Sequence, residues 1–296
     1  MAPQFSQTEK QFIDLVNSTP RFTLNGQVYN VLQACKPTTP KGECKTDVFI
    51  KTDIAEFKIS IKQSNADFLE NKMSYQRAVQ IFGADTDNIL RQSIKSIEES
   101  FLQHPLICFE KMGRTEAKTM MLGWKFELVN KKGGDKSGIL QLTDEQKLNV
   151  YSGHLLPNDK RNAYVNGKQV TNSGVANFIL EIDSIDTQDL QYYINNLEPI
   201  AEFSKNQTIY FACKALNYRS SQDKWDGDRP LSVYVDWKLE DSGKLIGSIN
   251  YDTPLQIKGN QVGEQVRGIL RSLGINNTNF DELKKLYNGI SHPTIF

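Results

Sequence analysis

The chain has 296 residues, and its 35 lysine and arginine residues balance 35 aspartate and glutamate residues, so its formal net charge at pH 7 is zero. This balance excludes a polybasic, histone-like protein, and a hydrophobic content of 39% excludes a largely disordered one. No stretch approaches the roughly 18 consecutive apolar residues of a membrane-spanning helix, and the first residues lack the basic start and apolar run of a signal peptide. We therefore expect a cytoplasmic protein without a membrane partner.

The N-terminal part of the chain predicts a helix, a strand and a β-hairpin, in that order. Apolar residues share one face of a helix over residues 6–16, and residues 27–34 favour a strand. Residues 46–51 and 55–63 are both rich in β-forming side chains and are separated by a short turn, which is typical of a hairpin.

The remaining sequence predicts further helices and strands in alternating groups. Helices are expected at residues 74–82, 85–101, 187–197, 261–273 and 280–287, with another beginning after Thr143, and strands at 119–129, 208–217, 231–239 and 245–250. No repeat or obvious linker interrupts the chain, so we expect one α+β domain of residues 1–296, or two tightly joined lobes. Its central mixed sheet would be flanked by helices, with the hairpin of residues 45–64 inside an N-terminal core of about residues 1–110.

Four cysteines are spread along the chain, at Cys35, Cys44, Cys108 and Cys213. They form no Cys-x-x-Cys pair and are too few for a disulfide framework, so we expect buried free thiols. The three histidines are too few and too scattered for a zinc site. The glycine motifs of NTPases and dinucleotide-binding proteins are also missing from the sequence.

The second strand of the hairpin carries a row of polar side chains. Strict alternation places the apolar residues of this strand on one face and Glu56, Lys58, Ser60 and Lys62 on the other. Asp47 stands at the start of the preceding strand. An aspartate beside a polar-x-lysine strand suits metal-assisted hydrolysis of a phosphodiester, because acidic oxygens hold Mg²⁺ and a lysine can hold or help deprotonate the attacking water.

Two registers of this hairpin are possible. A turn centred between residues 53 and 54 sets Asp47 opposite Ser60, with Lys62 as the lysine, and a turn centred between residues 51 and 52 sets it opposite Glu56, with Lys58 as the lysine. The two sets cannot serve one ion, because Glu56 and Ser60 are about 13 Å apart at a rise of roughly 3.3 Å per residue. Two ligands of one Mg²⁺ each lie about 2.1 Å from it.

The segments Lys45-Thr-Asp47 and Ile59-Ser-Ile-Lys62, the latter followed by Gln63-Ser-Asn65, resemble the catalytic hairpin of the PD-(D/E)xK nuclease superfamily, particularly of MspI-like type II restriction endonucleases. The predicted order of helix, strand, Asp-led strand, polar-x-Lys strand and helix is also the order of the superfamily's core. The resemblance implies a restriction-endonuclease-like core with insertions.

By the same resemblance, Asp47 binds Mg²⁺, Ser60 takes the place of the second acidic residue, and Lys62 is the catalytic lysine. A hydroxyl binds Mg²⁺ more weakly than a carboxylate does. We therefore expect a backbone carbonyl, Glu43 or Glu9 to complete the ligands, and Glu56 remains the alternative to Ser60.

Two segments after residue 110 carry residue types that contact DNA. Residues 111–136, which include Lys131 and Lys132, hold seven basic residues against three acidic ones, and this balance suits phosphate neutralisation. Residues 218–229 mix types that read base edges or stack on bases. The candidates in this second segment are Arg219, Gln222, Lys224, Trp225 and Arg229. A solvated surface is the alternative interpretation of both segments.

The resemblance implies an endonuclease that hydrolyses sequence-specific double-stranded DNA, as a monomer or a homodimer, with residues 111–296 supplying further core and DNA-contacting elements. Two alternatives stay open. One is a non-catalytic nucleic-acid-binding protein with a nuclease-like hairpin, and the other is a repair or phage nuclease of the same fold. Because the net charge is zero, affinity for DNA must come from local groups of positive charge.

Overall fold

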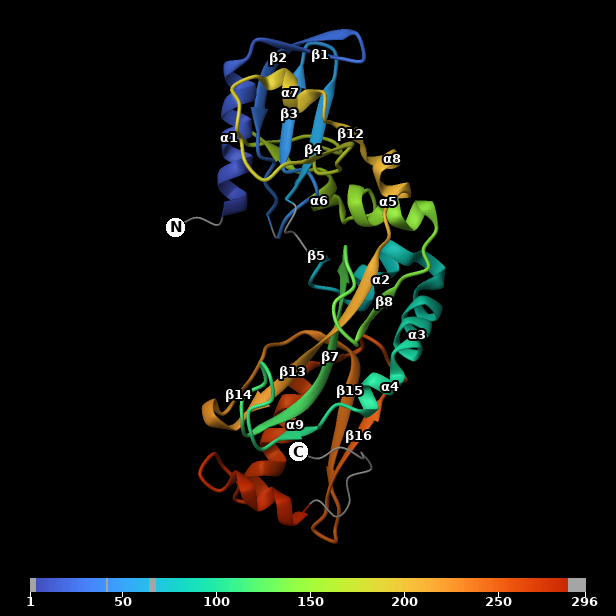
Figure 1. Cartoon of the computed structure of the whole chain (residues 1–296), viewed down its shortest axis with the longest axis vertical. Helices are drawn as coiled ribbons and strands as arrows, with labels where there is room; N and C mark the ends of the chain where they lie inside the picture. Colours follow the sequence, from blue (N-terminus) through green and yellow to red (C-terminus); the bar gives the residue numbers. More distant parts are fainter. Residues whose placement is uncertain (1–3, 41, 64–67, 287–296) are drawn as a thin grey trace. The chain divides into compact units, whose positions relative to one another are not determined.

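The computed structural model describes residues 4–40, 42–63 and 68–286, which fold as two compact units (Figure 1). Unit 1 takes in Met1–Asp67 and Leu142–Gln207, and unit 2 takes in Phe68–Gln141 and Thr208–Phe296. The α+β class expected from the sequence is confirmed, because helices accompany a mixed sheet in unit 1 and a second sheet in unit 2. The expected N-terminal core of residues 1–110 is divided differently in the structure, since residues 68–110 belong to unit 2.

Unit 1 is built on a six-stranded sheet in the order β1-β2-β3-β4-β11-β12. Strand β4 pairs antiparallel with β3 and parallel with β11, so the expected hairpin lies inside a mixed sheet and not at its edge. The strands are β1 (Arg21–Leu24), β2 (Gln27–Cys35), β3 (Val48–Thr52), β4 (Glu56–Lys62), β11 (Phe178–Glu181) and β12 (Glu198–Pro199).

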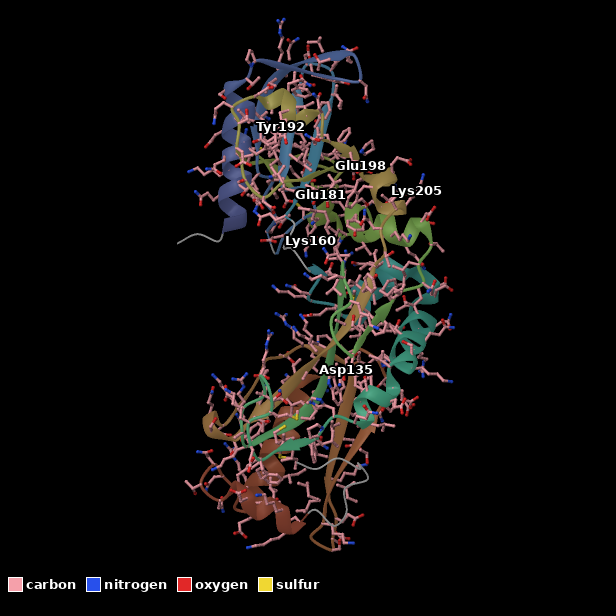
Figure 2. All side chains as sticks on the ribbon, viewed as in Figure 1. Asp135, Lys160, Glu181, Tyr192, Glu198 and Lys205 are labelled. Carbon is pink, nitrogen blue, oxygen red and sulfur yellow. The ribbon has the colours of Figure 1, made fainter. Side chains whose placement is uncertain are left out.

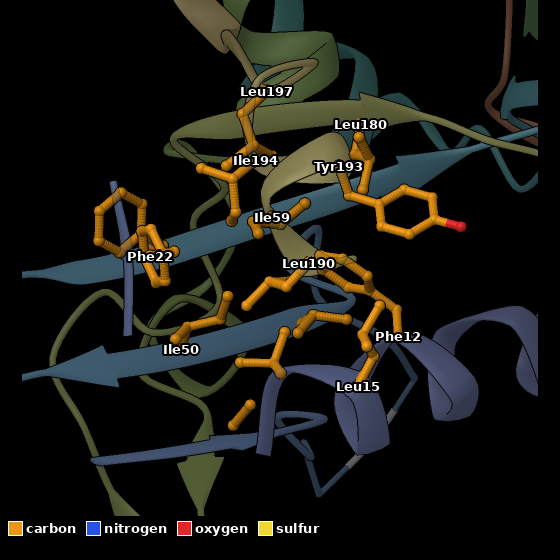
Figure 3. Packing of buried hydrophobic residues seen from close by; sticks show 14 of the residues in the cluster. Phe12, Leu15, Phe22, Ile50, Ile59, Leu180, Leu190, Tyr193, Ile194 and Leu197 are labelled. Carbon is orange, nitrogen blue, oxygen red and sulfur yellow. The ribbon is translucent and has the colours of Figure 1, made fainter. Parts of the chain in front are cut away.

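One face of this sheet carries the apolar core of unit 1, as the alternation in β4 predicts. Ile50 of β3 and Ile59 of β4 belong to one buried cluster with Phe12 of α1 (Gln4–Ser18) and with Leu190 and Tyr193 of α7 (Leu190–Ile194) (Figure 3). The ring centroids of Phe12 and Tyr193 are 5.9 Å apart in an edge-to-face arrangement. Helix α1 is therefore fixed to the sheet by side chains on one face.

The opposite face of the sheet is also largely covered. Phe49, Ser60 and Ile179 are buried and, by alternation, point away from the first cluster. Helix α8 packs against β11 and α5, and Tyr151 of α5 meets Phe203 of α8 with ring centroids 5.3 Å apart. The remaining elements of this unit are α5 (Asp144–Ser152), α6 (Asn158–Arg161), α8 (Ile200–Lys205) and the short strands β9 (Tyr164–Val165) and β10 (Lys168–Gln169).

Unit 2 is built on a second sheet with the main order β14-β13-β7-β15-β16. Its longest strand, β7 (Thr119–Val129), has the bounds predicted from the sequence. At Gly123 of β7, where φ is +145°, an added Cβ would lie 2.3 Å from the carbonyl oxygen of Val233 on the neighbouring strand β15. Only glycine therefore fits at this position. The other strands are β5 (Phe68–Glu70), β6 (Ile107–Cys108), β8 (Ser137–Ile139), β13 (Tyr210–Arg219), β14 (Lys224–Trp225), β15 (Pro230–Leu239), β16 (Leu245–Asn250) and β17 (Ile257–Lys258).

The helices of unit 2 follow the predicted positions with two differences. The helix expected at residues 85–101 is interrupted at Ile97, and the last predicted helix is a 3₁₀ helix. The helices are α2 (Tyr75–Phe82), α3 (Thr86–Ser96), α4 (Glu98–Leu102) and α9 (Gly259–Ser272), with 3₁₀ turns η1 (Gly83–Asp85), η2 (Ser220–Gln222) and η3 (Phe280–Leu286). Across the described ranges, no helix is long and apolar enough to cross a membrane.

All four cysteines are free thiols, as expected, but only two of them are fully buried. Cys108 and Cys213 lie inside unit 2, whereas Cys35 and Cys44 of unit 1 are half-buried. Burial raises the pKa of the Cys213 thiol to about 12, so this side chain stays protonated and behaves as a small apolar residue.

Candidate active site

The register of the β3–β4 hairpin places Asp47 opposite Ser60. Val48 pairs with Ile59 and Lys51 with Glu56, so the turn is centred between residues 53 and 54. The backbone N–H of Thr52 donates to the carbonyl of Ala55 at 2.9 Å, and the Thr52 hydroxyl accepts from the Ala55 N–H at 3.0 Å. The side chain at the first position of the turn thus helps to set the register.

The alternative register, with Asp47 beside Glu56 and Lys58, does not occur. Glu56 is exposed and lies opposite Lys51 at the turn end of the hairpin, whereas Asp47 lies just before the other end of β3. Lys58 lies opposite Phe49. The physical reason is the four-residue turn Thr52–Ala55, which is centred two residues later than this register requires.

The carboxylate of Asp47 is held by the neighbouring strand. Its Oδ2 atom accepts hydrogen bonds from the backbone N–H of Ile61 at 2.8 Å and from the hydroxyl of Ser60 at 3.2 Å. Its own backbone N–H donates to the carbonyl of Ile59 at 2.9 Å. Asp47 is therefore a half-buried acid with a fixed orientation.

The pKa of Asp47 lies above its ordinary value, because burial raises it more than the charge of Lys62, the hydrogen bonds from Ile61 and Ser60 and the charge of Lys36 lower it. Lys62 lies on the same strand face as Ser60, two residues further along β4, and is half-buried. Of the residues predicted from the sequence, Asp47, Ser60 and Lys62 are thus brought together at one place in unit 1.

Three further charged side chains, Lys36, Glu9 and Glu43, lie close to Asp47. Lys36, which follows β2, forms an ion pair with Glu9 on α1. Burial raises the pKa of Glu9, the hydrogen bond from Lys36 lowers it, and the carboxylates of Asp47 and Glu43 raise it again. Glu9, Glu43 and Asp47 therefore lie near enough to interact electrostatically. Glu9 and Glu43 are the two acids named from the sequence as additional ligands, and that role stays a prediction.

A pocket of about 200 Å³ opens beside these groups, and we call it the Asp47 pocket. Its polar lining includes Lys36, Glu43, Cys44, Thr46 and Asp47. Thr46 is only 1% exposed, and its hydroxyl has no hydrogen-bond partner among the atoms that the structure describes. A buried hydroxyl of this kind normally has a partner, and less than 1 Å² of this oxygen is accessible to solvent, so it is an unsatisfied polar atom inside the unit and not a group exposed in the pocket.

One acidic neighbour of this site, Glu181 on β11, was not predicted from the sequence (Figure 2). It pairs directly with Lys62 in the parallel ladder and is exposed. Burial, and then the charge of Glu181, raise the pKa of Tyr151 on α5. The only sequence signal was the short apolar run Phe178-Ile-Leu-Glu181, which periodicity alone does not identify as a strand.

The donors around Asp47 fit Mg²⁺ in their chemical type. This ion prefers carboxylate oxygens and water, usually with one or two carboxylates from the protein. Within the described part of the chain, however, no group of three or more His, Cys, Asp or Glu side chains is arranged to hold a metal ion. Asp47 with Glu9 or Glu43 would be the ligands. In this structure the Glu9 carboxylate forms an ion pair with Lys36.

The residues proposed to contact DNA all lie in unit 2, where neighbouring side chains engage Arg219 and Trp225. Arg219 forms ion pairs with Glu116 at 2.8 Å and with Asp226 at 2.7 Å. The Arg267 guanidinium lies over the ring of Trp225, 4.4 Å from its centroid, and the same ring lies close to α9 at Gly263. Trp225 is therefore a packing residue of α9 and is not presented as a free stacking surface.

The other proposed DNA contacts are exposed. Lys131 and Lys132 lie in the loop after β7, and Gln222, Lys224 and Arg229 lie between β13 and β15. The exposure of these five side chains fits both interpretations, a DNA-contacting surface and a solvated surface loop.

Comparison with known proteins finds no relative of this chain. No family model matches its sequence, and no curated protein or solved structure matches it. A function must therefore be inferred from the chemistry of its own residues, above all from those around Asp47.

Proposed function

We propose that the chain is a Mg²⁺-dependent endonuclease of the type II restriction kind, which hydrolyses phosphodiester bonds in double-stranded DNA. The observation that carries this proposal is the position of Asp47 opposite Ser60, with Lys62 on the same strand face inside a mixed sheet. In unit 1, α1, β2, β3 and β4 follow the order of helix, strand, Asp-led strand and polar-x-Lys strand in the PD-(D/E)xK core, with β1 between α1 and β2. The helix expected after them, α2, belongs to unit 2.

Each residue of the site has its own task in this proposal. Asp47, with Glu9 or Glu43, would hold the metal. A bound Mg²⁺ would supply positive charge at the scissile phosphate and make a water molecule more acidic. Lys62 orients the attacking water and stabilises the negative charge that develops on the phosphate. Ser60 is buried and donates its hydrogen bond to Asp47, so its task is to orient that carboxylate.

Binding of the DNA duplex is assigned to exposed side chains of unit 2. Lys131, Lys132, Lys224 and Arg229 would neutralise phosphates, and Gln222 could read a base edge. Arg219 and Trp225 are less suitable, because each is already engaged by neighbouring side chains. A monomer or a homodimer in the cytoplasm would fit this proposal.

A second candidate is a nucleic-acid-binding protein without catalytic activity. It is favoured by two observations: Asp47 Oδ2 already accepts two hydrogen bonds, and the described residues contain no preassembled group of three metal-binding side chains. Such a protein would bind DNA in Mg²⁺ or Mn²⁺ and leave it intact.

Incubation of the purified full chain with supercoiled plasmid DNA and Mg²⁺ tests these possibilities together. Discrete fragments that form with Mg²⁺ but not in the presence of EDTA support a restriction endonuclease. A continuous smear supports a repair or phage nuclease of the same fold. Retarded but intact DNA supports the non-catalytic candidate. If the plasmid is neither cleaved nor bound, the proposal of a DNA partner is overturned.

A further inference from the structure

Two hairpin turns in the described part of the chain have the same sequence at their tips, Asn25-Gly26 between β1 and β2 and Asn166-Gly167 between β9 and β10. In each hairpin the two residues that flank the turn pair with each other across the ladder. The backbone conformation also matches, since φ is +53° and +79° in the first turn and +48° and +79° in the second. The two turns therefore differ only in what surrounds them.

An asparagine that precedes a glycine can lose its side-chain amide without an enzyme. The backbone nitrogen of the glycine attacks Cγ of the asparagine, a new C–N bond forms, and the bond from Cγ to the amide nitrogen breaks. The glycine nitrogen gives up its proton, the amide nitrogen takes one up, and ammonia leaves a succinimide ring behind. Water then opens the ring at either carbonyl, which gives aspartate or isoaspartate.

Both turns present the attacking nitrogen in the same way. The glycine N–H takes no part in the ladder, which ends at the flanking pair of residues. Glycine also has no Cβ that would hinder the approach of its nitrogen to Cγ. A difference in reactivity must therefore come from the asparagine side chains.

These two side chains differ in their hydrogen bonds. Nδ2 of Asn166 donates a bond of 2.9 Å to Oε1 of Gln33, a half-buried residue of β2. The side chain of Asn25 is exposed and has no hydrogen-bond partner within the ranges that the structure describes. Cγ of Asn25 can thus turn towards the next backbone nitrogen, whereas Asn166 must first give up its bond to Gln33.

We propose that Asn25 is a site of spontaneous deamidation in the folded protein, and that the hydrogen bond to Gln33 protects Asn166 from the same reaction. Isoaspartate carries the main chain through its side chain, so it adds a carbon atom to the turn. A two-residue turn that is lengthened in this way no longer fits the pairing of Leu24 with Gln27. Because β1 is an outer strand of the sheet in unit 1, the modified chain loses strand pairing at this edge first.

Incubation of the folded full chain in mildly alkaline buffer, followed by tryptic digestion and mass spectrometry, provides the test. Asn25 and Asn166 lie on different tryptic peptides, and each product has the mass difference between an amide and a carboxyl group. We expect Asn25 to react about fivefold faster than Asn166, which corresponds to about 1 kcal/mol for one hydrogen bond. A third such sequence, Asn288-Gly289, lies outside the described residues and on another peptide, so it is measured separately.

The role of the hydrogen bond is tested at Gln33. Gln33→Ala removes the acceptor, so the rate at Asn166 should rise to that at Asn25, and the rate at Asn25 should stay unchanged. Gln33→Glu keeps an acceptor and is the matched control, in which Asn166 should remain slow. An unchanged rate at Asn166 in Gln33→Ala would exclude this bond as the source of protection.

The unchanged chain in urea completes the comparison, because the bond to Gln33 is absent there and the two rates should become similar. Equal rates in the folded chain, or a faster reaction at Asn166, overturn the proposal. A difference that persists in urea overturns it as well, since it would come from the local sequence. Circular dichroism checks the fold of each variant, and the comparison of the folded and the urea-denatured chain decides the proposal if a variant does not fold.

Discussion

The hydroxyl of Ser60 donates a hydrogen bond of 3.2 Å to the carboxylate of Asp47, which lies opposite it across the β3–β4 hairpin. Ser60 is 1% exposed, so this contact is formed inside unit 1 and not on its surface. A carboxylate in place of Ser60 would put two negative charges side by side. The serine instead leaves a single carboxylate at this place and orients it by donating a hydrogen bond.

Removing the charge of Asp47 or of Lys62 should abolish DNA cleavage. We expect Asp47→Asn and Lys62→Met each to lower the cleavage rate about a thousandfold or more, because one removes a metal ligand and the other the group that orients water. DNA binding, measured by gel retardation, should change little. Plasmid cleavage in Mg²⁺ measures the effect, and cleavage at an unchanged rate by either variant would contradict the proposed mechanism.

Alanine substitution at Ser60 should lower stability and the cleavage rate, whereas alanine substitution at Glu56 should change neither. Ser60→Ala removes a hydrogen bond in a buried position, so we expect a stability loss of about 1 kcal/mol and slower cleavage. Glu56→Ala alters an exposed residue opposite Lys51 and should change neither. Urea denaturation and plasmid cleavage measure the two quantities. Loss of cleavage with Glu56→Ala alone would contradict the assignment of the active site to Asp47, Ser60 and Lys62.

The register of the β3–β4 hairpin could not be predicted from the alternation of its residues. Alternation correctly assigned the faces of β4, but it gave two registers, because period 2 is the same in both. The choice between them depends on the turn, where the hydroxyl of Thr52 accepts from the N–H of Ala55. A Ser or Thr at the start of a turn commonly makes this contact, so the signal was present but local and weak.

The contact between Trp225 and α9 predicts a packing effect at Gly263. An added Cβ at Gly263 would lie 2.5 Å from Cδ2 of Trp225, so Gly263→Ala should destabilise the protein by about 1–3 kcal/mol and shift Trp225 towards solvent. Gly268→Ala on the same helix is the control, because nothing lies within 4 Å of its added Cβ, and it should be neutral or slightly stabilising. Thermal unfolding and tryptophan fluorescence measure these effects, and equal behaviour of the two variants would contradict the packing role of Trp225.

Asp223 should make the stability of the protein depend on pH at the acidic end. The hydrogen bond from the Tyr218 hydroxyl, at 2.6 Å, and the charge of Arg267 hold the pKa of Asp223 below its ordinary value. A lowered pKa stabilises the folded state above the unfolded pKa, which is about 3.9, and this contribution is lost as the pH falls through the lower folded value.

Asp223→Asn tests this dependence with little change in shape, because asparagine tolerates the left-handed backbone of this position, where φ is +45°. We expect a loss of less than about 1 kcal/mol at pH 7, since an exposed charge is screened by water. The difference from the unchanged chain should vanish at strongly acidic pH. Denaturant unfolding at several pH values measures it, and a difference independent of pH would exclude the charge of Asp223 as its cause.

Replacing the two lysines of the exposed loop after β7 should weaken the salt dependence of DNA binding. If Lys131 and Lys132 each neutralise a phosphate, the double change to glutamine should reduce the slope of log K against log salt by about 2 and weaken binding to every sequence similarly. The same change at Lys284 and Lys285, which pair with Asp281 and Glu282 in the same unit, is the control. Fluorescence anisotropy at several salt concentrations measures the slope, and equal slopes for all three proteins would place the DNA contacts elsewhere.

The division into two units was not predictable from periodicity, although many single elements were. Strand β7 was predicted to the residue, and helix α9 within two residues at its start, because both are long and strongly patterned. Strand β11 was missed because four residues give too short a pattern. Without β11 the sequence could not indicate that residues 142–207 complete the sheet of unit 1, nor that Glu181 lies beside Lys62.

The parallel pairing of β4 with β11 also fixes when the Asp47 site can be completed during synthesis of the chain. Residues 63–177 separate the two strands, and they include the whole first stretch of unit 2. While the ribosome adds these residues, the outer edge of β4 has no neighbour, and an unpaired strand edge is a template for wrong pairing. A nascent chain that has not yet reached Glu181 therefore carries Asp47, Ser60 and Lys62 on an unfinished sheet, and nuclease activity would arise only late in translation.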